Sequence, residues 1–430
     1  MYCRALPSSA AAAALSGSPH GPPCRGTACV AAATPNPHEQ YPRMNIPNFH
    51  PAPQARNSFA PAQTASTQTP AGAAPGPGSI LCLDIGSGTQ DVLLTMPGLN
   101  PENWPRFVLP TPARRVARRI AELTAEGRHI WLHGENMGGG FFGSVKAHVA
   151  AGLRMAAHPE AALALHDNPE RVRAFGVDIA DSCPAGFAPV RLADYEPGFW
   201  RALLDTCGLP QPHLVVAAAQ DHGHHPQGSN TVGRFELWRD FLSNSADGQS
   251  GDGQAGANPA SLIYDVPPPQ FTRLATLQRA IGGGPVADTG AAAVLGALAL
   301  PEVQARSARE GVLVVNAGNS HTIAFLVFRQ RVWGVYEHHT GMLTTESLLH
   351  DLNEFRLCWL PDEQVRAAGG HGSAFAPDIP PETEGFRPAF VLGPRREMLR
   401  GHGQFIAPHG DMMLAGCHGL LHGLELRGGA

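Results

Sequence analysis

The stretch ILCLDIGSGTQDVLL, residues 80–94, places a loop rich in small and polar residues between two apolar runs. Each run, Ile80–Leu83 and Val92–Leu94, is typical of a short buried strand. A tight hairpin needs only about two or three turn residues, so this loop is longer than chain reversal requires. Its glycines let backbone N–H groups approach a ligand closely, and Ser87 and Thr89 add hydroxyl donors. The stretch predicts an anion-binding loop, with a glycine-rich bulged hairpin as the alternative.

A second stretch, VVNAGNSHTIAFLV at residues 314–327, repeats this layout of strand, small polar loop and strand. Asn316 takes the position that Asp84 has in the first stretch. A carboxylate at the end of a strand suits hydrated Mg²⁺, which we expect Asp84 to hold. Two such loops facing each other across a cleft would hold the phosphates of a nucleotide from both sides.

The elements that follow each loop also repeat. The first series is predicted to have strands at residues 80–83, 92–95, 107–109, 129–132 and 213–219, with helices at 112–126 and 142–155. The second is predicted to have strands at 312–316, 322–328, 332–338, 388–392 and 404–407, with helices at 345–357, 395–400 and 411–424. Three strands and then alternating helices and strands, found twice, predict a duplicated α/β domain with a cleft between its halves.

The rest of the chain suggests its organisation. Residues 1–78 are rich in proline and alanine and hold a single acidic residue, Glu39, so we expect a disordered tail. The two halves are predicted at residues 79–307 and 308–430, with a Gly/Ser-rich insertion at 243–261 in the first.

Composition excludes several classes of protein. The chain has 430 residues, of which 43% are hydrophobic and 16% charged, and a net charge of -5 argues against nucleic acid as a partner. No apolar run approaches the roughly 18 residues of a membrane-spanning helix. The eight cysteines form no CxxC pair and no CxxxCxxC run, which argues against a zinc ribbon, a disulfide framework and an iron–sulfur radical enzyme. A reducing cytoplasm is the simplest setting.

Two further stretches are candidates for function. In PVADTGAAAVLGALAL, residues 285–300, Asp288 precedes a helix of small residues, where an N-cap role is the alternative to a functional one. In VLGPRREML, residues 391–399, a strand ends in Gly-Pro before a helix. That arrangement admits a flat ring, with a plain turn as the alternative.

Together the four stretches resemble the superfamily of actin, sugar and acetate kinases and heat-shock chaperones, over residues 79–430. DIGSGTQD is similar to its first phosphate loop, NAGNSHT to its second, and VLGPRREML to its adenosine segment. VADTGAAAVLGAL is similar to the segment of glycerol- and xylulose-type kinases whose aspartate accepts the proton of the sugar hydroxyl.

The resemblance implies duplicated ribonuclease H-like (actin-like ATPase) domains with a nucleotide cleft between them, and ATP and Mg²⁺ as cofactors. It implies catalytic roles for Asp84, which would hold Mg²⁺, and for Asp288 as general base. It implies nucleotide contacts by Gly86, Ser87, Gly88, Thr89, Gln90, Gly318, Asn319, Ser320, Thr322 and Gly393. Asn316 stands where many relatives carry Asp, a departure that weakens a two-carboxylate magnesium site.

The body of the chain also resembles an uncharacterised microbial family labelled "putative pyruvate formate-lyase activating enzyme". That label implies radical chemistry, for which the sequence shows no cysteine motif.

Histidine-rich segments follow three apolar strands: HGENMGGG (133–140), QDHGHHPQGSN (220–230) and YEHHTG (336–341). Open α/β sheets place ligands at strand ends, and imidazole with carboxylate suits Zn, Fe or Mn. Asp221, His222, His224 and His225 could form much of a transition-metal site, the three histidines being its ligands. The alternative is a hydrogen-bonding pocket for a polar substrate.

These features predict an ATP-dependent phosphotransferase acting on a small polar metabolite. Its acceptor pocket would be lined by His133, Glu135, Asn136, Asp221 and His222. A second hypothesis is an ATP-driven activator or switch that acts on a partner enzyme. A third is a metal-binding protein of the same fold.

Overall fold

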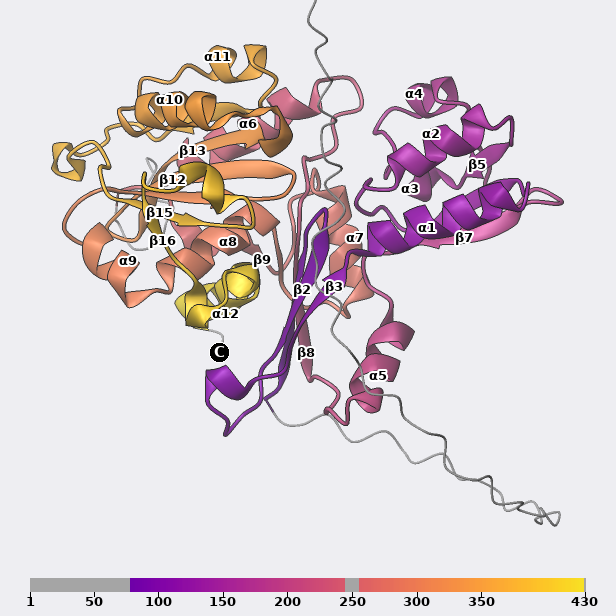
Figure 1. Cartoon of the computed structure of the whole chain (residues 1–430), viewed down its shortest axis with the longest axis horizontal. Coiled ribbons are helices and arrows are strands. Elements are labelled where there is room, and N and C mark those ends of the chain that lie inside the picture. The colour runs from indigo at the N-terminus through magenta and orange to yellow at the C-terminus, as the bar shows by residue number, and fades with distance from the viewer. Residues whose placement is uncertain (1–77, 244–254, 429–430) are drawn as a thin grey trace, which may run out of the picture. The chain divides into compact units, whose positions relative to one another are not determined.

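A computed structural model of the chain describes residues 78–243 and 255–428 (Figure 1). The predicted tail, apart from Gly78, and most of the predicted insertion at 243–261 lie outside the described residues. Both therefore stay predictions, as do the domain boundaries at 79–307 and 308–430. Within the described ranges, no helix is both long and apolar enough to cross a membrane.

The first of two six-stranded sheets has the order β3-β2-β1-β8-β10-β9. Strands β1, β2 and β3 form an antiparallel meander, β8 lies parallel to β1, β10 lies parallel to β8, and β9 is antiparallel to β10. The strands are β1 (Ile80–Ile85), β2 (Thr89–Leu94), β3 (Arg106–Pro110), β8 (Leu214–Ala219), β9 (Ile263–Tyr264) and β10 (Val286–Ala287).

The second six-stranded sheet has the order β14-β13-β12-β11-β15-β16. Here too a meander of three strands comes first. Strand β14 then pairs antiparallel with β13 at the edge of the sheet, and β15 lies parallel to β11 as β8 does to β1. The strands are β11 (Val312–Ala317), β12 (His321–Phe328), β13 (Arg331–His339), β14 (Gly372–Phe375), β15 (Ala389–Leu392) and β16 (Gln404–Phe405). The order β3-β2-β1-β8-β10 thus matches the order β13-β12-β11-β15-β16, which confirms the predicted duplicated α/β fold of the ribonuclease H type.

A third, four-stranded parallel sheet with the order β6-β5-β4-β7 was not predicted. Its strands are β4 (Ile130–Gly134), β5 (Met155–Ala157), β6 (Val177–Ile179) and β7 (Ala188–Leu192). The predicted strand at 129–132 therefore belongs to this inserted sheet and not to the first repeat. A short apolar run does not reveal its pairing partner, which is why the sequence did not separate the two sheets.

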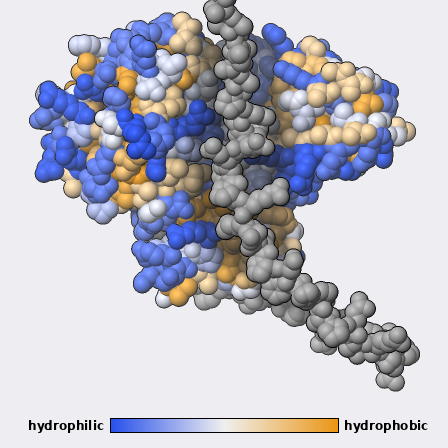
Figure 2. All heavy atoms as spheres, in the orientation of Figure 1, coloured by the Kyte–Doolittle hydropathy of each residue, from blue (hydrophilic) through white to orange (hydrophobic). Residues whose placement is uncertain are grey.

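Helices α1 (Pro112–Ala125) and α2 (Phe142–Ala150) pack on the inserted sheet, together with the short α3 (Pro159–Ala162) and α4 (Pro169–Ala174) (Figure 1). In α1 the residues Val116, Ile120 and Leu123 are buried, and most of its arginines are exposed. Figure 2 shows hydrophilic residues along this helix, as expected of an amphipathic helix at the surface.

The remaining helices surround the two larger sheets. They are α5 (Pro197–Thr206), α6 (Asn230–Ser243), α7 (Thr272–Ala280), α8 (Thr289–Leu298), α9 (Pro301–Ser307), α10 (Thr345–Arg356), α11 (Asp362–Ala367) and α12 (Ala415–Leu426). The predicted helices at 112–126 and 345–357 are confirmed to within a residue. The one at 411–424 begins with a 3-10 turn, Met412–Leu414, before α12.

Helices α8 and α12 pack against each other through their backbones. A Cβ atom added at Gly419 would lie 1.7 Å from the carbonyl oxygen of Ala292, and one added at Gly296 would lie 2.0 Å from that of Ala415. Only glycine permits such an approach. Helix α12 also packs on β1 and β8, so the C-terminal helix lies beside the first loop.

Candidate functional site

The two predicted phosphate loops have the same internal turn. The Gly86 N–H donates to the Thr89 carbonyl at 3.0 Å, and the Gly318 N–H donates to the His321 carbonyl at 3.0 Å. The loops also approach each other, since a Cβ atom added at Gly88 would lie 3.1 Å from Asn319 Nδ2. The predicted juxtaposition of the loops is therefore present in the structure.

A small cavity of about 90 Å³ lies where the loops meet. Its walls also include Gly393 and Pro394 after β15, residues of α8, and the first residues of α12. All four stretches singled out in the sequence thus converge on one point. Ligands of about the size of a nucleotide occupy pockets of roughly 300–1,000 Å³. The small cavity would therefore have to widen before it could hold a nucleotide.

Asp84 lies at the end of β1 on this cavity and is buried. Thr289 Oγ1 donates to Asp84 Oδ1 at 2.5 Å, and a Cβ atom added at Gly416 would lie 2.0 Å from Asp84 Oδ2. Burial raises the pKa of Asp84 to about 7, against the opposing effect of the Thr289 hydrogen bond. A bound cation would favour the ionised carboxylate.

Asp91 is a second carboxylate that the sequence interpretation missed. It is the cross-strand partner of Asp84 in the β1–β2 ladder and lines the same small cavity. Burial, and then the charge of Asp84, raise the pKa of Asp91 to about 8. The DxGxxxxD spacing that carries both residues was visible in the sequence. The two carboxylates together offer the oxygen ligands that Mg²⁺ prefers.

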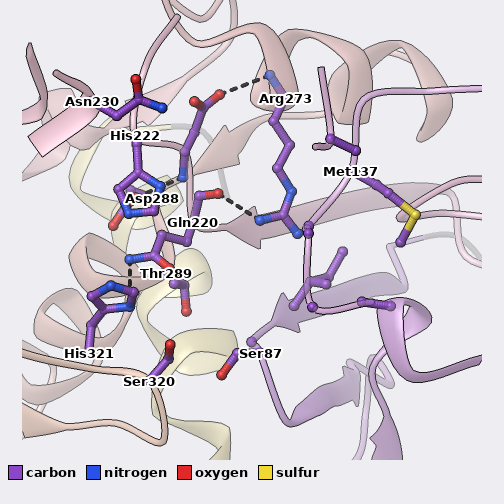
Figure 3. Close-up of a pocket in the computed structure, with 18 of the residues that line it drawn as sticks. Ser87, Met137, Gln220, His222, Asn230, Arg273, Asp288, Thr289, Ser320 and His321 are labelled. Carbon is purple, nitrogen blue, oxygen red and sulfur yellow. Dashed lines mark hydrogen bonds between the residues drawn. The ribbon is translucent and has the colours of Figure 1, made fainter. Parts of the chain in front are cut away.

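A larger cavity of about 500 Å³ adjoins the loops (Figure 3). Both cavities are lined by Gly86, Ser87, Thr289, Asn316, Gly318 and Asn319. A phosphate held between the loops would therefore face the larger cavity. Figure 3 shows the rings of His222 and His321 close together, on the side of this cavity away from Met137.

Asp221 organises one wall of the larger cavity. Its carboxylate accepts hydrogen bonds from the backbone N–H groups of Gly223, Arg273 and Leu274, at 2.9 to 3.0 Å. The Arg273 side chain in turn donates to Asp194 at 2.7 and 3.0 Å and to the carbonyl oxygen of Gln220 at 2.6 Å. Asp221 thus fixes the start of α7 and leaves little acceptor capacity for a substrate.

Asp288 lines the larger cavity but is held by other groups. Arg234, which is 3% exposed, donates to its two carboxylate oxygens at 3.1 and 3.2 Å. Asp288 also accepts from the Gly290 N–H at 2.9 Å, so it is the N-cap of α8 that the sequence allowed as the alternative. To act as a general base, its carboxylate would have to leave Arg234.

Arg234 also donates through Nε to Glu337 Oε2 at 2.5 Å, which links Asp288 and Glu337. Burial alone would raise the pKa of Glu337, but the Arg234 guanidinium holds that pKa well below its usual range. The pKa of Arg234 is held above its usual value by Asp288 and Glu337, against the effect of its burial. Glu337 and Arg234 are therefore both charged at neutral pH.

Three histidines surround Glu337. One nitrogen each of His222, His321 and His371 and one Glu337 oxygen all lie within 4.8 Å of one another. Burial lowers the pKa of His321 to about 4 and that of His371 to about 3, and it holds the pKa of His222 well below its usual value. The three imidazoles are therefore neutral.

The predicted substrate residues divide into two groups. Asn136, Asp221 and His222 line the larger cavity. His133 and Glu135 do not: the His133 ring stacks on Trp131 at 4.9 Å, and Glu135 lies 3.5 Å from Arg191.

Most of the predicted nucleotide residues line one of the two cavities: Gly86, Ser87, Gly88, Thr89, Gly318, Asn319, Ser320 and Gly393. Gln90 and Thr322 line neither. Gln90 is buried in β2, and the Thr322 hydroxyl bonds that of Thr340 at 3.0 Å. Gln90 and Thr322 both lie near the start of a strand. Successive side chains of a strand point to opposite faces, so a residue beside one that faces the cavity can point into the core.

The predicted metal set of His222, His224 and His225 is not brought together. His224 Nδ1 lies 3.4 Å from Asp167, and the His225 N–H donates to Asp167 at 2.8 Å. Only His222 belongs to the group with His321, Glu337 and His371. The sequence contained His321 in the second loop and Glu337 in YEHHTG, but no local signal marked His371.

Comparison with known protein families gives one match that covers more than half of the chain. The family described as "Putative pyruvate format-lyase activating enzyme (DUF1786)" matches residues 137–398. The chain belongs to this family. The matched segment contains the second loop and the four residues His222, His321, Glu337 and His371, and it begins after the first loop.

No curated protein matches the chain. Among solved structures, ethanolamine utilization protein EutJ from Carboxydothermus hydrogenoformans aligns with a TM-score of 0.23 and 10% identity, over 81% of this chain and 91% of that chain. An exopolyphosphatase-like protein aligns with a TM-score of 0.25 and 9% identity, over 81% and 88%. The assignment of the fold rests on the order of the strands in the two sheets, not on these alignments.

Proposed function

We propose that this protein binds a nucleoside triphosphate with Mg²⁺ between its two glycine-containing loops and transfers the terminal phosphoryl group into the larger cavity. The observation that carries the proposal is the convergence of both loops, Gly393–Pro394, α8 and α12 on one small cavity. These segments are far apart in the sequence, and each has the chemistry that one part of a nucleotide requires.

The loops supply backbone N–H groups and hydroxyls for the phosphates, at residues 86–89 and 318–320. Asp84 and Asp91 supply carboxylates for Mg²⁺. Gly393 and Pro394, with Met412 and Met413 on the same cavity, offer an apolar surface to the flat base. The nucleotide supplies the transferable group, and positioning and charge neutralisation are what the protein contributes.

The larger cavity has the size and polarity for a small polar acceptor. Its arginines, Arg234 and Arg273, are already paired with carboxylates. Asn136, Asn230, Ser320 and His222 remain as uncharged polar groups on its wall. An acceptor held by such groups would be a polar and largely uncharged molecule.

A second candidate is a nucleotide-driven switch that acts on a partner enzyme. The engagement of Asp288 by Arg234 favours it, because a hydrolytic switch needs a positioned water and not a strong base for an alcohol. Slow ATP hydrolysis without an added acceptor would favour the switch, and hydrolysis that depends on a metabolite would favour the transferase.

Isothermal titration of the full chain with ATP·Mg²⁺, with ATP in chelator and with ADP tests the proposal. We expect binding of ATP that depends on Mg²⁺ and that is weakened at least tenfold in Asp84→Ala. Asp240→Ala, at an exposed aspartate in α6, is the matched control and should bind as the wild type does. Absence of nucleotide binding by the wild type would refute the proposal.

A further inference from the structure

The histidine–glutamate group, defined as His222, His321, Glu337 and His371, is assembled from four separate segments. His222 follows β8, His321 begins β12, Glu337 lies in β13, and His371 directly precedes β14. In the β12–β13 ladder His321 pairs with His339 and Glu337 pairs with Ile323, so His321 and Glu337 project from the same face. The His371 N–H donates to the Glu337 carbonyl at 2.9 Å, which places His371 beside them.

The three imidazole rings of the group lie close to one another. The ring of His222 stacks on that of His371 at 5.2 Å, and the ring of His321 lies 5.6 Å from His222 and 4.9 Å from His371. These rings come from both six-stranded sheets and their adjoining loops. If these positions served only to fill the core, apolar side chains would pack there as well as histidines do.

Each histidine of the group has a buried ring nitrogen without a hydrogen-bond partner in the described part of the chain. His222 Nε2, His321 Nε2 and His371 Nδ1 are buried and have no hydrogen-bond partner within the described ranges. The side chain of His371 is only 3% exposed. Buried polar atoms nearly always have a partner, because an unpaired one costs free energy. Coordination of one metal ion would satisfy all three nitrogens at once.

The charges around the group also favour a cation. Two carboxylates, Asp288 and Glu337, pair with the single guanidinium of Arg234. This buried network therefore has one more acidic than basic side chain, and a divalent cation would supply the missing positive charge. Arg234 and Gln220 each donate to Glu337, at 2.5 and 3.2 Å, and so hold its carboxylate in place.

We propose that His222, His321, His371 and Glu337 bind one divalent transition-metal ion at the wall of the larger cavity. Three imidazoles and a carboxylate suit Zn²⁺, Fe²⁺ or Mn²⁺. His222, His321 and Glu337 line the cavity, so an ion there keeps a coordination position open to a water or to a substrate oxygen. The site does not depend on the proposed nucleotide binding.

Gln220 has a defined part in this site. Its amide nitrogen donates to His321 Nδ1 at 3.0 Å. A His321 that binds metal through Nε2 must carry its proton on Nδ1 and present it to an acceptor. Rotation of the Gln220 amide by half a turn provides that acceptor and ends its donation to Glu337, whose carboxylate would then bind the metal. We therefore expect the Gln220 side-chain oxygen to face His321 in the metal-bound protein.

The test uses the full chain, purified without an affinity tag or chelator. We expect elemental analysis to find one equivalent of metal, and a chelator-treated sample to bind Zn²⁺ in a competition titration. Replacing a ligand should lower Zn²⁺ affinity by at least about 100-fold, beyond the 10- to 100-fold typical of groups that only orient a ligand. His371→Gln and His321→Ala are the ligand variants, and His224→Ala, two residues from His222, is the matched control.

Thermal unfolding and Co²⁺ absorption distinguish loss of a metal ligand from loss of the fold. Zn²⁺ should raise the melting temperature of the wild type and of His224→Ala but not that of folded His371→Gln. Co²⁺ should give visible absorption bands in the wild type that are lost in the ligand variants. A wild type without metal that binds Zn²⁺ more weakly than about 10 μM would overturn the proposal. Equal loss of affinity in His224→Ala and His371→Gln would also overturn it, whatever the nucleotide titration shows.

Discussion

Asp84 and Gly416 are in direct contact, although they lie near opposite ends of the folded chain. A Cβ atom added at Gly416 would lie 2.0 Å from Asp84 Oδ2. The first turn of α12 thus covers the carboxylate at the end of β1. A change in the packing of the C-terminal helix should therefore change the pKa of Asp84.

Gly416→Ala should destabilise the protein because the added methyl group forces α12 away from Asp84. Overpacking of this kind costs roughly 1–3 kcal/mol. Thermal and denaturant unfolding would measure the loss. Gly198→Ala in α5 is the matched control: an added Cβ meets nothing within 4 Å there, so no loss is expected. Equal stability of Gly416→Ala and the wild type would show that α12 does not press on Asp84.

The pKa of Asp84 predicts a pH dependence of stability. The folded protein retains a proton up to about pH 7 that the unfolded chain loses near pH 3.8. The contribution of this group to stability is therefore full below pH 3.8 and is lost as the pH rises through 7.

Asp84→Asn should remove that dependence, so the stability difference between wild type and variant should change by a few kcal/mol, to order of magnitude, between pH 4 and 7. Denaturant titrations of both proteins over this range would measure it. The stability of the wild type should fall relative to the variant as the pH rises. A constant difference would mean that Asp84 ionises normally.

Thr289→Val removes the hydroxyl that donates to Asp84 while keeping the shape of the side chain. Without this donor the ionised carboxylate loses a partner, so the pKa of Asp84 should rise further and Mg²⁺-dependent nucleotide binding should weaken. Loss of a hydrogen bond to a charged group corresponds to about 1.5–3 kcal/mol, or roughly tenfold or more in affinity. Thr206→Val is the control: its hydroxyl donates to the Ala202 carbonyl at an exposed position in α5, so binding should be unchanged.

Asp288→Asn removes the ion pair with Arg234 but keeps the N-cap of α8, so it separates the contributions of these two interactions to stability. Asn caps a helix about as well as Asp, so any loss of stability reports the lost pairing with buried Arg234, which should cost up to about 3–5 kcal/mol. Asp411→Asn is the control, since Asp411 also caps a helical turn but has no salt bridge in the described part of the chain. Denaturant unfolding is the measurement.

The same variants test catalysis. If Asp288 is a general base, turnover in Asp288→Asn should fall by roughly 10²–10⁴ under conditions where the protein is folded. Stability lost with turnover retained would assign Asp288 to the ion pair alone and favour the switch over the transferase.

The sequence predicted the fold through local patterns that occur twice. Apolar runs on both sides of residues 84–91 and 316–321 marked β1–β2 and β11–β12, because alternation and loop composition are short-range signals. The strands Met155–Ala157 and Val177–Ile179 of the inserted sheet have three residues each, too few for a period to show.

The site was predictable only where its parts belong to the loops. Arg234 lies in a helix, where a charged residue is usually solvent-exposed, but Asp288 and Glu337 from other elements neutralise it and allow its burial. His371 joins His222 and His321 through the pairing of β13 with β14, which no local pattern encodes. Long-range pairing is therefore what the sequence left undetermined.

The contact between α8 and α12 determines how the small cavity can widen. Gly296 and Gly419 bring one backbone directly against the other, so no side chain separates the helices at these two contacts. Sliding one helix along the other would drive a carbonyl into the neighbouring backbone, whereas a small rotation about the glycine contacts would not. We therefore expect the pair to serve as a pivot, and a turn of α12 about it to move Gly416 relative to Asp84 at the first loop.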